Sequence, residues 1–285
     1  MQEGPARSQF PELIIHSALI GIALLIVLTL LTTRPPAAAA PASEDQDSLK
    51  STSNVPHVCT QLQSTSKGAV PLSSKWRQGR TLRVFLMGGS SYVKSKVREY
   101  AVQWNQFSSV TFQFVDDPSA EIRVSFVPGG SNSQVGTDCL DIPQGNASMN
   151  FGWFDDQTKD DEFSRVVLHE FGHALGLIHE HQNPSSHIPW NKPKVYKYYK
   201  STQGWTQEQV NHNIFEFYDQ NITNFSTFDR KSIMLYPIPA SLTINNSFEV
   251  GWNRTLSETD KTFIGTVYPK NATSSNGIEQ LVQSQ

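Results

Sequence analysis

The most informative residues of this chain are three histidines and a glutamate, spaced as HExxHxxGxxH from His169. His169 and His173 are four residues apart, so on a helix their imidazoles lie on one face, one turn apart. Two ring nitrogens on that face can bind one metal ion. Gly176 can adopt the positive φ that ends such a helix, and the chain can then bring His179 to the same ion. Three neutral imidazoles leave the fourth position of Zn²⁺ open for water, as catalytic zinc sites require.

Glu170 has a different expected role, because it follows the first expected ligand. From there its carboxylate can take a proton from a metal-bound water. A core helix that carries histidines by chance is the alternative interpretation. A second motif argues against it: some fifty residues on, the chain reads SIMLYP, with Met234 followed two positions later by Tyr236. The pattern therefore predicts one Zn²⁺ per chain and hydrolysis by a metal-activated water.

The two motifs together resemble those of the metzincin zinc peptidases. Glu180 directly follows the third histidine, and Tyr236 follows the methionine by two residues, which is similar to the astacin-like branch. Residues 150–156 and 256–260 also resemble the astacin-like peptidases of fungi and bacteria. The resemblance covers roughly residues 76–269. The chain departs from the family in having two cysteines where true astacins usually carry four in the catalytic domain, and in lacking a pro-segment with an aspartate latch.

The resemblance implies a zinc-dependent endopeptidase that acts on proteins or peptides. It implies that the Tyr236 hydroxyl donates a hydrogen bond to the oxyanion of the tetrahedral intermediate, with a packed core tyrosine as the alternative. Met234 is expected to form an apolar floor below the metal. The expected site residues are three zinc ligands, two catalytic residues and three structural residues: His169, His173 and His179; Glu170 and Tyr236; Gly176, Glu180 and Met234.

Two other classes stay open. A non-catalytic, zinc-stabilised binding or adhesion domain would use the same ligands, but such a domain would not need the base that Glu170 supplies. A matrixin-like or serralysin-like metzincin is the alternative among enzymes. Glu180 favours the astacin-like branch, and no calcium-binding repeat follows the domain.

The chain contains two cysteines, Cys59 and Cys139. Two cysteines in an exported chain most simply pair, so a disulfide between them is the favoured expectation. Two free thiols are the second possibility. The third is a latch, in which the Cys59 thiolate binds the zinc of a latent form, although residues 57–60 do not match the latch sequence of the matrix enzymes.

Composition divides the chain into four regions. Residues 1–34 contain an uncharged stretch, 13–31, that is longer than the ~7–15 residues of a signal peptide core and close to the ~20 that span a bilayer. It predicts a signal peptide or a single-pass anchor, and either one sends the protein to the secretory pathway. Residues 35–75 are rich in Ala, Pro, Ser and Thr and predict a flexible linker. The catalytic domain is expected over 76–270, followed by a disordered tail over 271–285.

The net charge of −3 gives no basic surface for nucleic acid, so no nucleic-acid partner is expected. An extracellular location, with or without a membrane anchor, agrees with this weakly charged composition. Six N-glycosylation sequons add support for export: Asn146, Asn221, Asn224, Asn245, Asn253 and Asn271.

The order of the predicted elements indicates an α/β (α+β) fold of the metzincin type. An upper lobe is expected to combine a mixed, twisted sheet with the zinc-site helix, and a lower lobe to be irregular and mostly helical. Residues 148–153 are expected to form the upper rim of the cleft, where an extended substrate could pair as an added strand. The remaining expected elements are strands over 82–87, 110–115 and 121–126 and helices over 91–107, 194–200, 207–218 and from Ser257 to about 268.

Overall fold

The computed structural model describes residues 57, 59–62, 74–217 and 226–270, all within one of the two compact units of the chain, Ser53–Gln285. Among these residues no helix is long and apolar enough to cross a membrane. The predictions for residues 13–31, for most of the linker and for the C-terminal tail lie outside the described residues. So do three of the six sequons: Asn221, Asn224 and Asn271.

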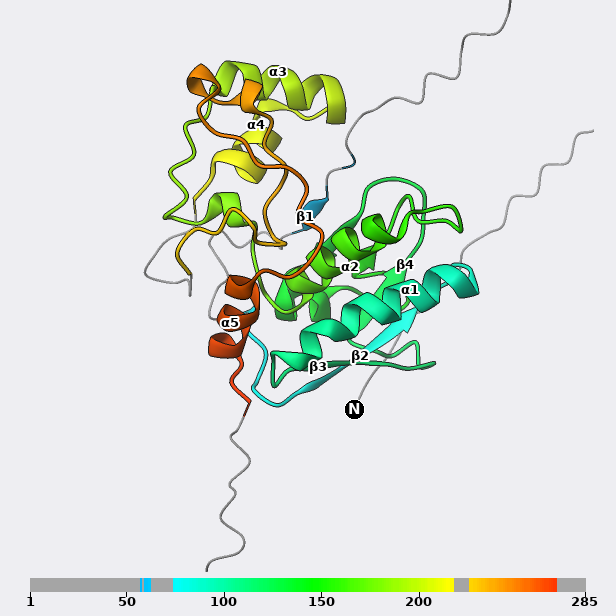
Figure 1. The fold of residues 1–285 in the computed structure, drawn as a ribbon. Helices are drawn as coiled ribbons and strands as arrows, with labels where there is room; N and C mark the ends of the chain where they lie inside the picture. The colour runs from blue at the N-terminus through cyan, green and yellow to red at the C-terminus, as the bar shows by residue number, and fades with distance from the viewer. Residues whose placement is uncertain (1–56, 58, 63–73, 218–225, 271–285) are drawn as a thin grey trace, which may run out of the picture. The chain divides into compact units, whose positions relative to one another are not determined.

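A six-stranded mixed sheet is the framework of the described unit (Figure 1). Its strand order is β1-β5-β6-β4-β2-β3, and every neighbouring pair is parallel except β5 with β6. The predicted mixed sheet is thus confirmed. The strands are β1 (Thr60–Leu62), β2 (Thr81–Leu86), β3 (Thr111–Phe114), β4 (Ile122–Ser125), β5 (Asn132–Gln134) and β6 (Met149–Asn150).

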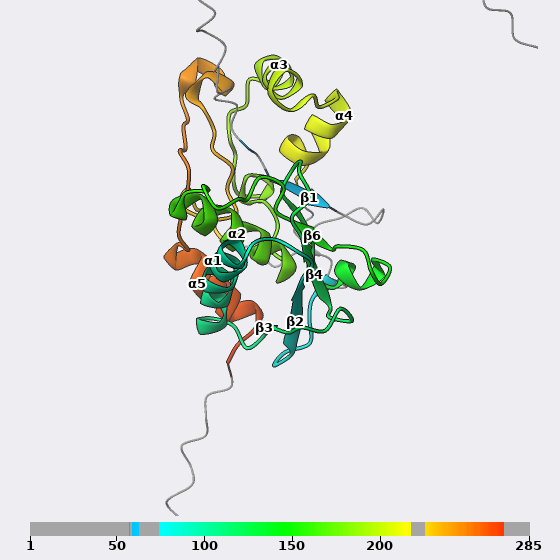
Figure 2. The same ribbon diagram turned by 90° about the vertical axis from the view of Figure 1, so that its right-hand side faces the viewer.

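Two helices lie side by side on one face of the sheet (Figures 1 and 2). They are α1 (Ser91–Ala101), which continues as a 3₁₀ turn over Val102–Gln106, and α2 (Asp160–Ala174), which carries the first zinc-motif histidines. The α2 side chain of Phe171 packs edge-on against Phe112 of β3, with ring centroids 4.8 Å apart. Trp104 Nε1 donates to the Leu168 carbonyl at 3.0 Å. These contacts fix α2, and therefore the metal-binding face, against the sheet.

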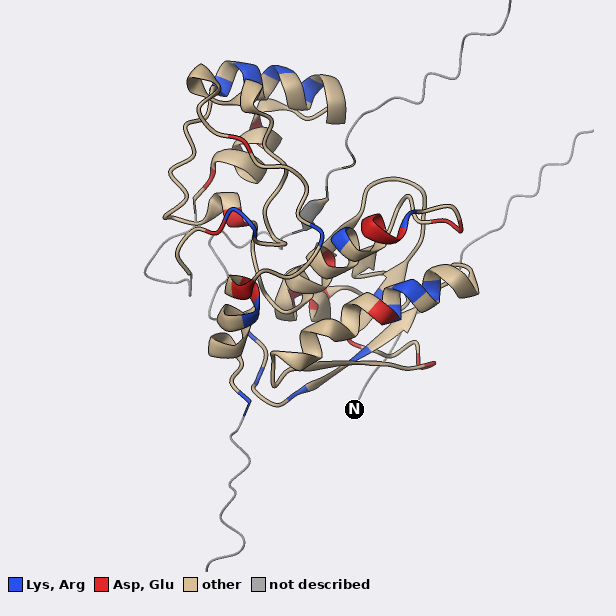
Figure 3. Cartoon of the chain, viewed as in Figure 1, with Lys and Arg blue, Asp and Glu red and all other residues tan. Residues whose placement is uncertain are grey.

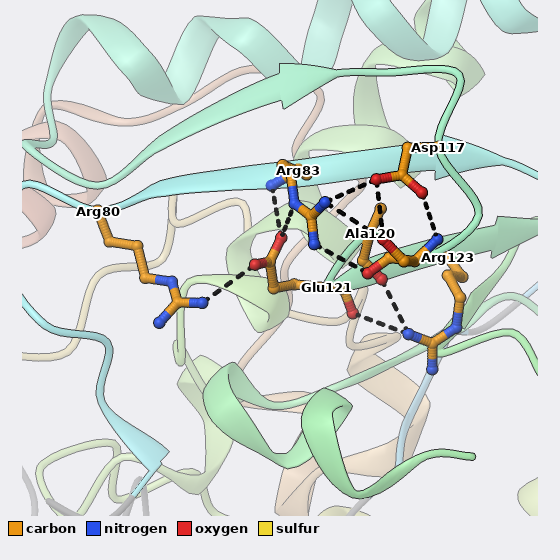
Figure 4. A network of polar contacts seen from close by, with 7 residues as sticks. Arg80, Arg83, Asp117, Ala120, Glu121 and Arg123 are labelled. Carbon is orange, nitrogen blue, oxygen red and sulfur yellow. Dashed lines mark hydrogen bonds and ion pairs between the residues drawn. The ribbon is translucent and has the colours of Figure 1, made fainter. Parts of the chain in front are cut away.

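A buried arginine ties β4 to the loop that precedes β6. Figure 4 shows its contacts with the carbonyls of Ala120 and Glu121. Arg123 is only 1% exposed, and its guanidinium is satisfied by backbone carbonyls. It donates to three of them at 2.7–2.9 Å: those of Ala120, Ile142 and Asn146. A buried charge is tolerated because its hydrogen-bonding groups are paired. The sequence gives no signal for this role.

Beyond α2 the chain is irregular and mostly helical, as the sequence predicts. The four lysines on α3 (Lys192, Lys194, Lys197 and Lys200) are exposed, and basic residues recur along this helix (Figure 3). The capping box at Ser257 is present, with Ser257 Oγ accepting from the Asp260 backbone N–H at 3.0 Å. The longer elements are α3 (Lys192–Gln203), α4 (Gln207–Val210) with a π turn over Asn211–Phe215, and α5 (Glu258–Val267).

Two expectations for extended segments differ from the structure. β6 lies between β5 and β4, and both of its edges are paired, so residues 148–153 cannot accept a substrate as an added strand. On the side of β6 away from β4, the neighbouring strand is β5. Residues 60–62, which the composition assigns to the linker, instead form β1 and pair in parallel with β5. The edge of β5 that faces away from β6 is therefore covered by the chain's own N-terminal segment.

Candidate active site

The three histidines converge as the motif predicts. Helix α2 ends at Ala174, and Gly176 has φ 96°, which turns the chain back toward the helix. The ring centroids of His169 and His173 are 4.8 Å apart, and that of His179 lies 4.7 Å from His173 and 5.3 Å from His169. One ring nitrogen from each lies within 4.8 Å of the others, so the three can bind one ion.

The hydrogen bonds of the imidazoles fit a metal ion. Nδ1 of His169 lies 2.8 Å from the Ile233 carbonyl, and Nδ1 of His173 lies 2.8 Å from the Leu177 carbonyl. A carbonyl only accepts, so each Nδ1 carries the proton and each Nε2 is left as an electron-pair donor.

The Nε2 atoms then need a partner. That of His173 is 3.2 Å from the Nε2 of His179, and the buried Nε2 of His169 has no hydrogen-bond partner among the described residues. Buried, unpartnered nitrogen acceptors that lie this close together destabilise the fold unless a cation binds between them. The donor set and geometry therefore fit Zn²⁺.

Burial also keeps these rings in the metal-binding protonation state. Desolvation lowers the pKa of His173 to about 4 and the pKa values of His169 and His179 well below the ordinary 6.5. The neutral imidazole is the form that binds a metal, so the site is ready for one at neutral pH.

Glu170 is fully buried beside the first histidine. Desolvation raises the pKa of its carboxyl group to about 8, and neither oxygen accepts a hydrogen bond of normal geometry from a described residue. A nearby positive charge favours the ionised form of a carboxyl group. The cation that fits the three imidazoles would therefore also favour a charged Glu170, as a general base must be.

The Met turn lies directly against α2. The Met234 side chain is buried, and a Cβ atom added at Gly172 would lie 2.4 Å from its sulfur. Glycine at this position, close to one turn after His169, therefore allows the methionine to approach. The Met234 side chain thus packs on the helix turn that carries His169 and His173.

Two buried carboxylates hold the loops of the site together. The Glu180 backbone N–H donates to the Met234 carbonyl at 3.0 Å, and Glu180 Oε1 accepts from the Asp229 backbone N–H at 2.8 Å. Asp260 of α5 accepts from Ser232 Oγ at 2.7 Å and from the Ile233 backbone N–H at 2.8 Å. Glu180 therefore links the loop after His179 to the Met turn and to Asp229, and Asp260 adds a second tie to the Met turn that the sequence does not reveal.

Tyr236 lies among the histidines. Its ring centroid is 4.3 Å from that of His179 and 6.0 Å from that of His169. Its hydroxyl donates a short hydrogen bond to the backbone carbonyl of Cys59. The ring position fits either a catalytic or a packing role, and the hydroxyl is engaged by the N-terminal segment.

Both cysteines are free and buried, which contradicts the favoured disulfide. The Cys59 sulfur belongs to a second cluster with His169 and Glu170, whose ligand atoms lie within 4.8 Å of one another. Desolvation, followed by the charge of Glu170, raises the pKa of its thiol. Cys139 lies instead in the 3₁₀ turn Gly136–Asp141, where burial raises its pKa to about 12. The position of Cys59 beside the histidines agrees with the latch alternative.

Two further residues at the site are not predicted from the sequence. His181 is buried, stacks on His179 at 5.2 Å and places Nε2 2.7 Å from the Asn213 carbonyl. Arg165 is buried on α2 and lies over the ring of Trp252 at 4.1 Å. The one sequence signal for Arg165 is that it precedes His169 by four residues, because this spacing places both side chains on the same helix face.

The fold and the site together define a zinc metallopeptidase of the metzincin class. A family model described as Astacin, a family of peptidases, matches residues 69–281. The chain therefore belongs to the astacin family. This confirms the predicted fold class, the zinc cofactor, the enzyme class and protein or peptide substrates.

Three known proteins illustrate the relationship. One solved structure of myroilysin is 51% identical, covers 72% of this chain and 100% of its own, and has a TM-score of 0.69. A second myroilysin structure is 47% identical, with 75% and 91% coverage and a TM-score of 0.58. The interstitial collagenase of Bos taurus is 31% identical over 91 residues, which is 27% of this chain and 19% of the collagenase. The chain thus spans only about a fifth of that protein.

Proposed function

We propose that this chain hydrolyses internal peptide bonds of proteins by a zinc-activated water, and that it is latent while Cys59 and β1 stay bound at the site. The observation that carries the first part is the convergence of three neutral imidazoles beside a buried glutamate. When bound, zinc lowers the pKa of a water ligand and polarises the scissile carbonyl.

The protein residues have separate roles in this proposal. His169, His173 and His179 hold the metal. Glu170 accepts a proton from the attacking water and passes it to the leaving amine, acting first as general base and then as general acid. The Tyr236 hydroxyl donates a hydrogen bond to the oxyanion that develops on the substrate. The ring centroid of Tyr236 lies 4.3 Å from that of His179, which supports this role.

Three contacts of the N-terminal segment support latency. β1 pairs with β5 at the edge of the sheet, the sulfur of Cys59 lies beside His169 and Glu170, and the hydroxyl of Tyr236 is bound to the Cys59 carbonyl. A cysteine thiolate is a preferred zinc ligand, so Cys59 would take the position that water needs. While the segment is in place, both proposed catalytic residues are covered.

We further propose that residues 1–34 direct the protein to the secretory pathway, as a cleaved signal or a retained anchor, with the catalytic domain outside the cell. The uncharged stretch over 13–31 supports this. Asn146 and Asn245 are exposed and can accept glycans, whereas Asn253 donates to the carbonyls of Arg230 and Ser232 and is less suited to do so. N-terminal sequencing of the mature protein distinguishes a signal from an anchor.

Peptidase assays on two variants test the function and the latency separately. Zinc-loaded Cys59→Ser protein should hydrolyse an unfolded protein substrate, and Glu170→Gln in the same background should keep its zinc and lose nearly all turnover. An inactive Cys59→Ser protein with a full equivalent of zinc would contradict the peptidase assignment. Equal activity of the parent chain and Cys59→Ser would contradict the latency alone.

A further inference from the structure

A pocket of about 360 Å³ lies at the N-terminal end of α2. It is lined by His57, Trp153 and residues at the start of α2, including Glu162. His57 is two residues from Cys59, and two residues of chain span at most about 7 Å. The pocket therefore lies within two residue positions of the point where Cys59 approaches the metal ligands.

The ring of Trp153 is held in a fixed orientation at this pocket. Its Nε1 donates to Glu162 Oε1 at 3.1 Å, and its ring lies edge-on to Phe154 with centroids 6.5 Å apart. The imidazole of His57 packs against it, with centroids 4.5 Å apart and the planes at 42°. A planar side chain of the N-terminal segment thus forms one wall of the pocket and packs on the indole ring.

The carboxylates around the pocket are already paired. Glu162 binds Arg165 at 2.6 Å, and Asp161 binds Arg254 at 2.8 Å. Because each of these two carboxylates has a cationic partner, neither carries an unneutralised charge to attract a cationic side chain. The tryptophan face is left as the main recognition element, and aromatic rings pack favourably on such a face.

Arg165 also positions the chain that enters the pocket. Its Nη2 donates to the His57 backbone carbonyl at 3.4 Å, and its Nε and Nη2 also donate to the Glu162 carboxylate. This contact holds the main chain beside Trp153, so that the side chain of the same residue falls on the indole ring.

We propose that the face of Trp153 at this pocket is a substrate subsite for an aromatic or imidazole side chain, and that His57 covers this face in the latent form. The proposal rests on the proposed function and adds a preference for residues near the scissile bond. The His57 ring is the precedent for the ligand, since it packs on the indole face that a substrate ring would contact after the segment leaves.

Matched peptides test the subsite. Zinc-loaded Cys59→Ser protein is given internally quenched peptides that differ only by Phe or Ala at each of the two positions on either side of the cleaved bond. At one position the ratio of kcat/KM for Phe to that for Ala should be about three to ten, the range expected for one aromatic contact. Trp153→Leu should bring this ratio close to one, and Trp153→Phe should largely restore it.

Trp205→Leu is the matched control, because Trp205 is also partly buried and stacks on a ring, that of Tyr199 at 4.9 Å, but lines no part of the pocket. It should leave the Phe-to-Ala ratio unchanged. A ratio near one at all four positions in the parent protein would overturn the subsite. So would a Trp153→Leu variant that slows every peptide equally and keeps the ratio.

A second measurement needs no peptidase activity. In the intact chain, the alkylation rate of Cys59 reports how often the segment leaves the cleft. His57→Ala and Trp153→Leu should each raise this rate about three- to tenfold, and His57→Phe should not. If His57→Ala leaves the alkylation rate of Cys59 unchanged, the proposed binding of the His57 ring at Trp153 is wrong, whatever the activity of the protein. Absence of peptide hydrolysis with the expected alkylation pattern would instead count against the peptidase assignment.

Discussion

Replacement of Tyr236 by Phe should have opposite effects on latency and on catalysis, because one hydroxyl is proposed to serve both. In the structure the Tyr236 hydroxyl donates to the Cys59 carbonyl, and after the segment leaves it is available to the oxyanion of the substrate. The substitution removes the hydroxyl and keeps the ring, which packs 4.3 Å from His179. The surrounding structure should therefore survive the change.

The two effects differ in size. Loss of one neutral hydrogen bond weakens binding of the N-terminal segment to the cleft by about 0.5–1.5 kcal/mol. This corresponds to a roughly two- to twelvefold increase in the population in which the segment is dissociated. Loss of one oxyanion donor typically lowers kcat by about 10²–10³. Since the decrease in kcat is larger than the gain from easier dissociation of the segment, Tyr236→Phe should be less active than its parent once the segment no longer blocks the cleft.

The two effects can be measured separately. In the intact chain, Tyr236→Phe should be alkylated at Cys59 about two- to twelvefold faster than the parent. In the Cys59→Ser background, it should lower kcat and kcat/KM together by about 10²–10³ while KM and a zinc content near one equivalent are retained. A kcat within about twofold of the Cys59→Ser parent would refute the catalytic role and leave a packed tyrosine.

Three further predictions concern the site and the core. Glu170→Gln in the Cys59→Ser background should bind zinc normally and lose at least about 10²-fold in kcat, and turnover close to that of its parent would remove Glu170 as the base. Burial lowers the pKa values of four histidines (His169, His173, His179 and His181) below 6.5, and raises the pKa values of two carboxyl groups (Glu170 and Glu180) to about 8. Between about pH 6.5 and about pH 5 the four histidines outweigh the two carboxyl groups, so the unfolded chain binds more protons than the folded chain. The metal-free protein should therefore lose stability as the pH falls from about 6.5 to about 5, and denaturant unfolding that gave equal free energies at these two pH values would contradict this. Arg123→Met leaves one buried and two partly buried carbonyl contacts without their donor and should cost about 2–3 kcal/mol in denaturant unfolding, whereas a change below about 0.5 kcal/mol would show that the carbonyls find other partners.

The parts of the site that depend on local spacing could be predicted from the sequence. A four-residue interval sets His169 and His173 on one helix face, and Gly176 has the positive φ that the motif requires. The alternation in β2, with every second residue buried, is likewise readable from the sequence. In these cases the physical cause acts within a few residues, so the sequence alone contains it.

The parts that depend on distant pairing could not be predicted. β5 reads Asn-Ser-Gln, with no apolar alternation, and it is a strand because β6 and β1 pair with it. Cys59 meets His169 from far away in the chain, so the general tendency of exported cysteines to pair pointed to Cys139 instead. The polar side chains of Asp260 and Arg123 likewise find partners that no short sequence pattern reveals.

Stepwise return of zinc to the metal-free Cys59→Ser protein tests the central assignment most directly. The protein is stripped with a chelator, titrated with Zn²⁺ and assayed at each step for hydrolysis of an unfolded protein. Three imidazoles that converge on one point predict that activity rises linearly and reaches its plateau at one equivalent of zinc per chain. Activity that survives chelation, or that stays absent when one equivalent of zinc is bound, would contradict a zinc peptidase built on His169, His173 and His179.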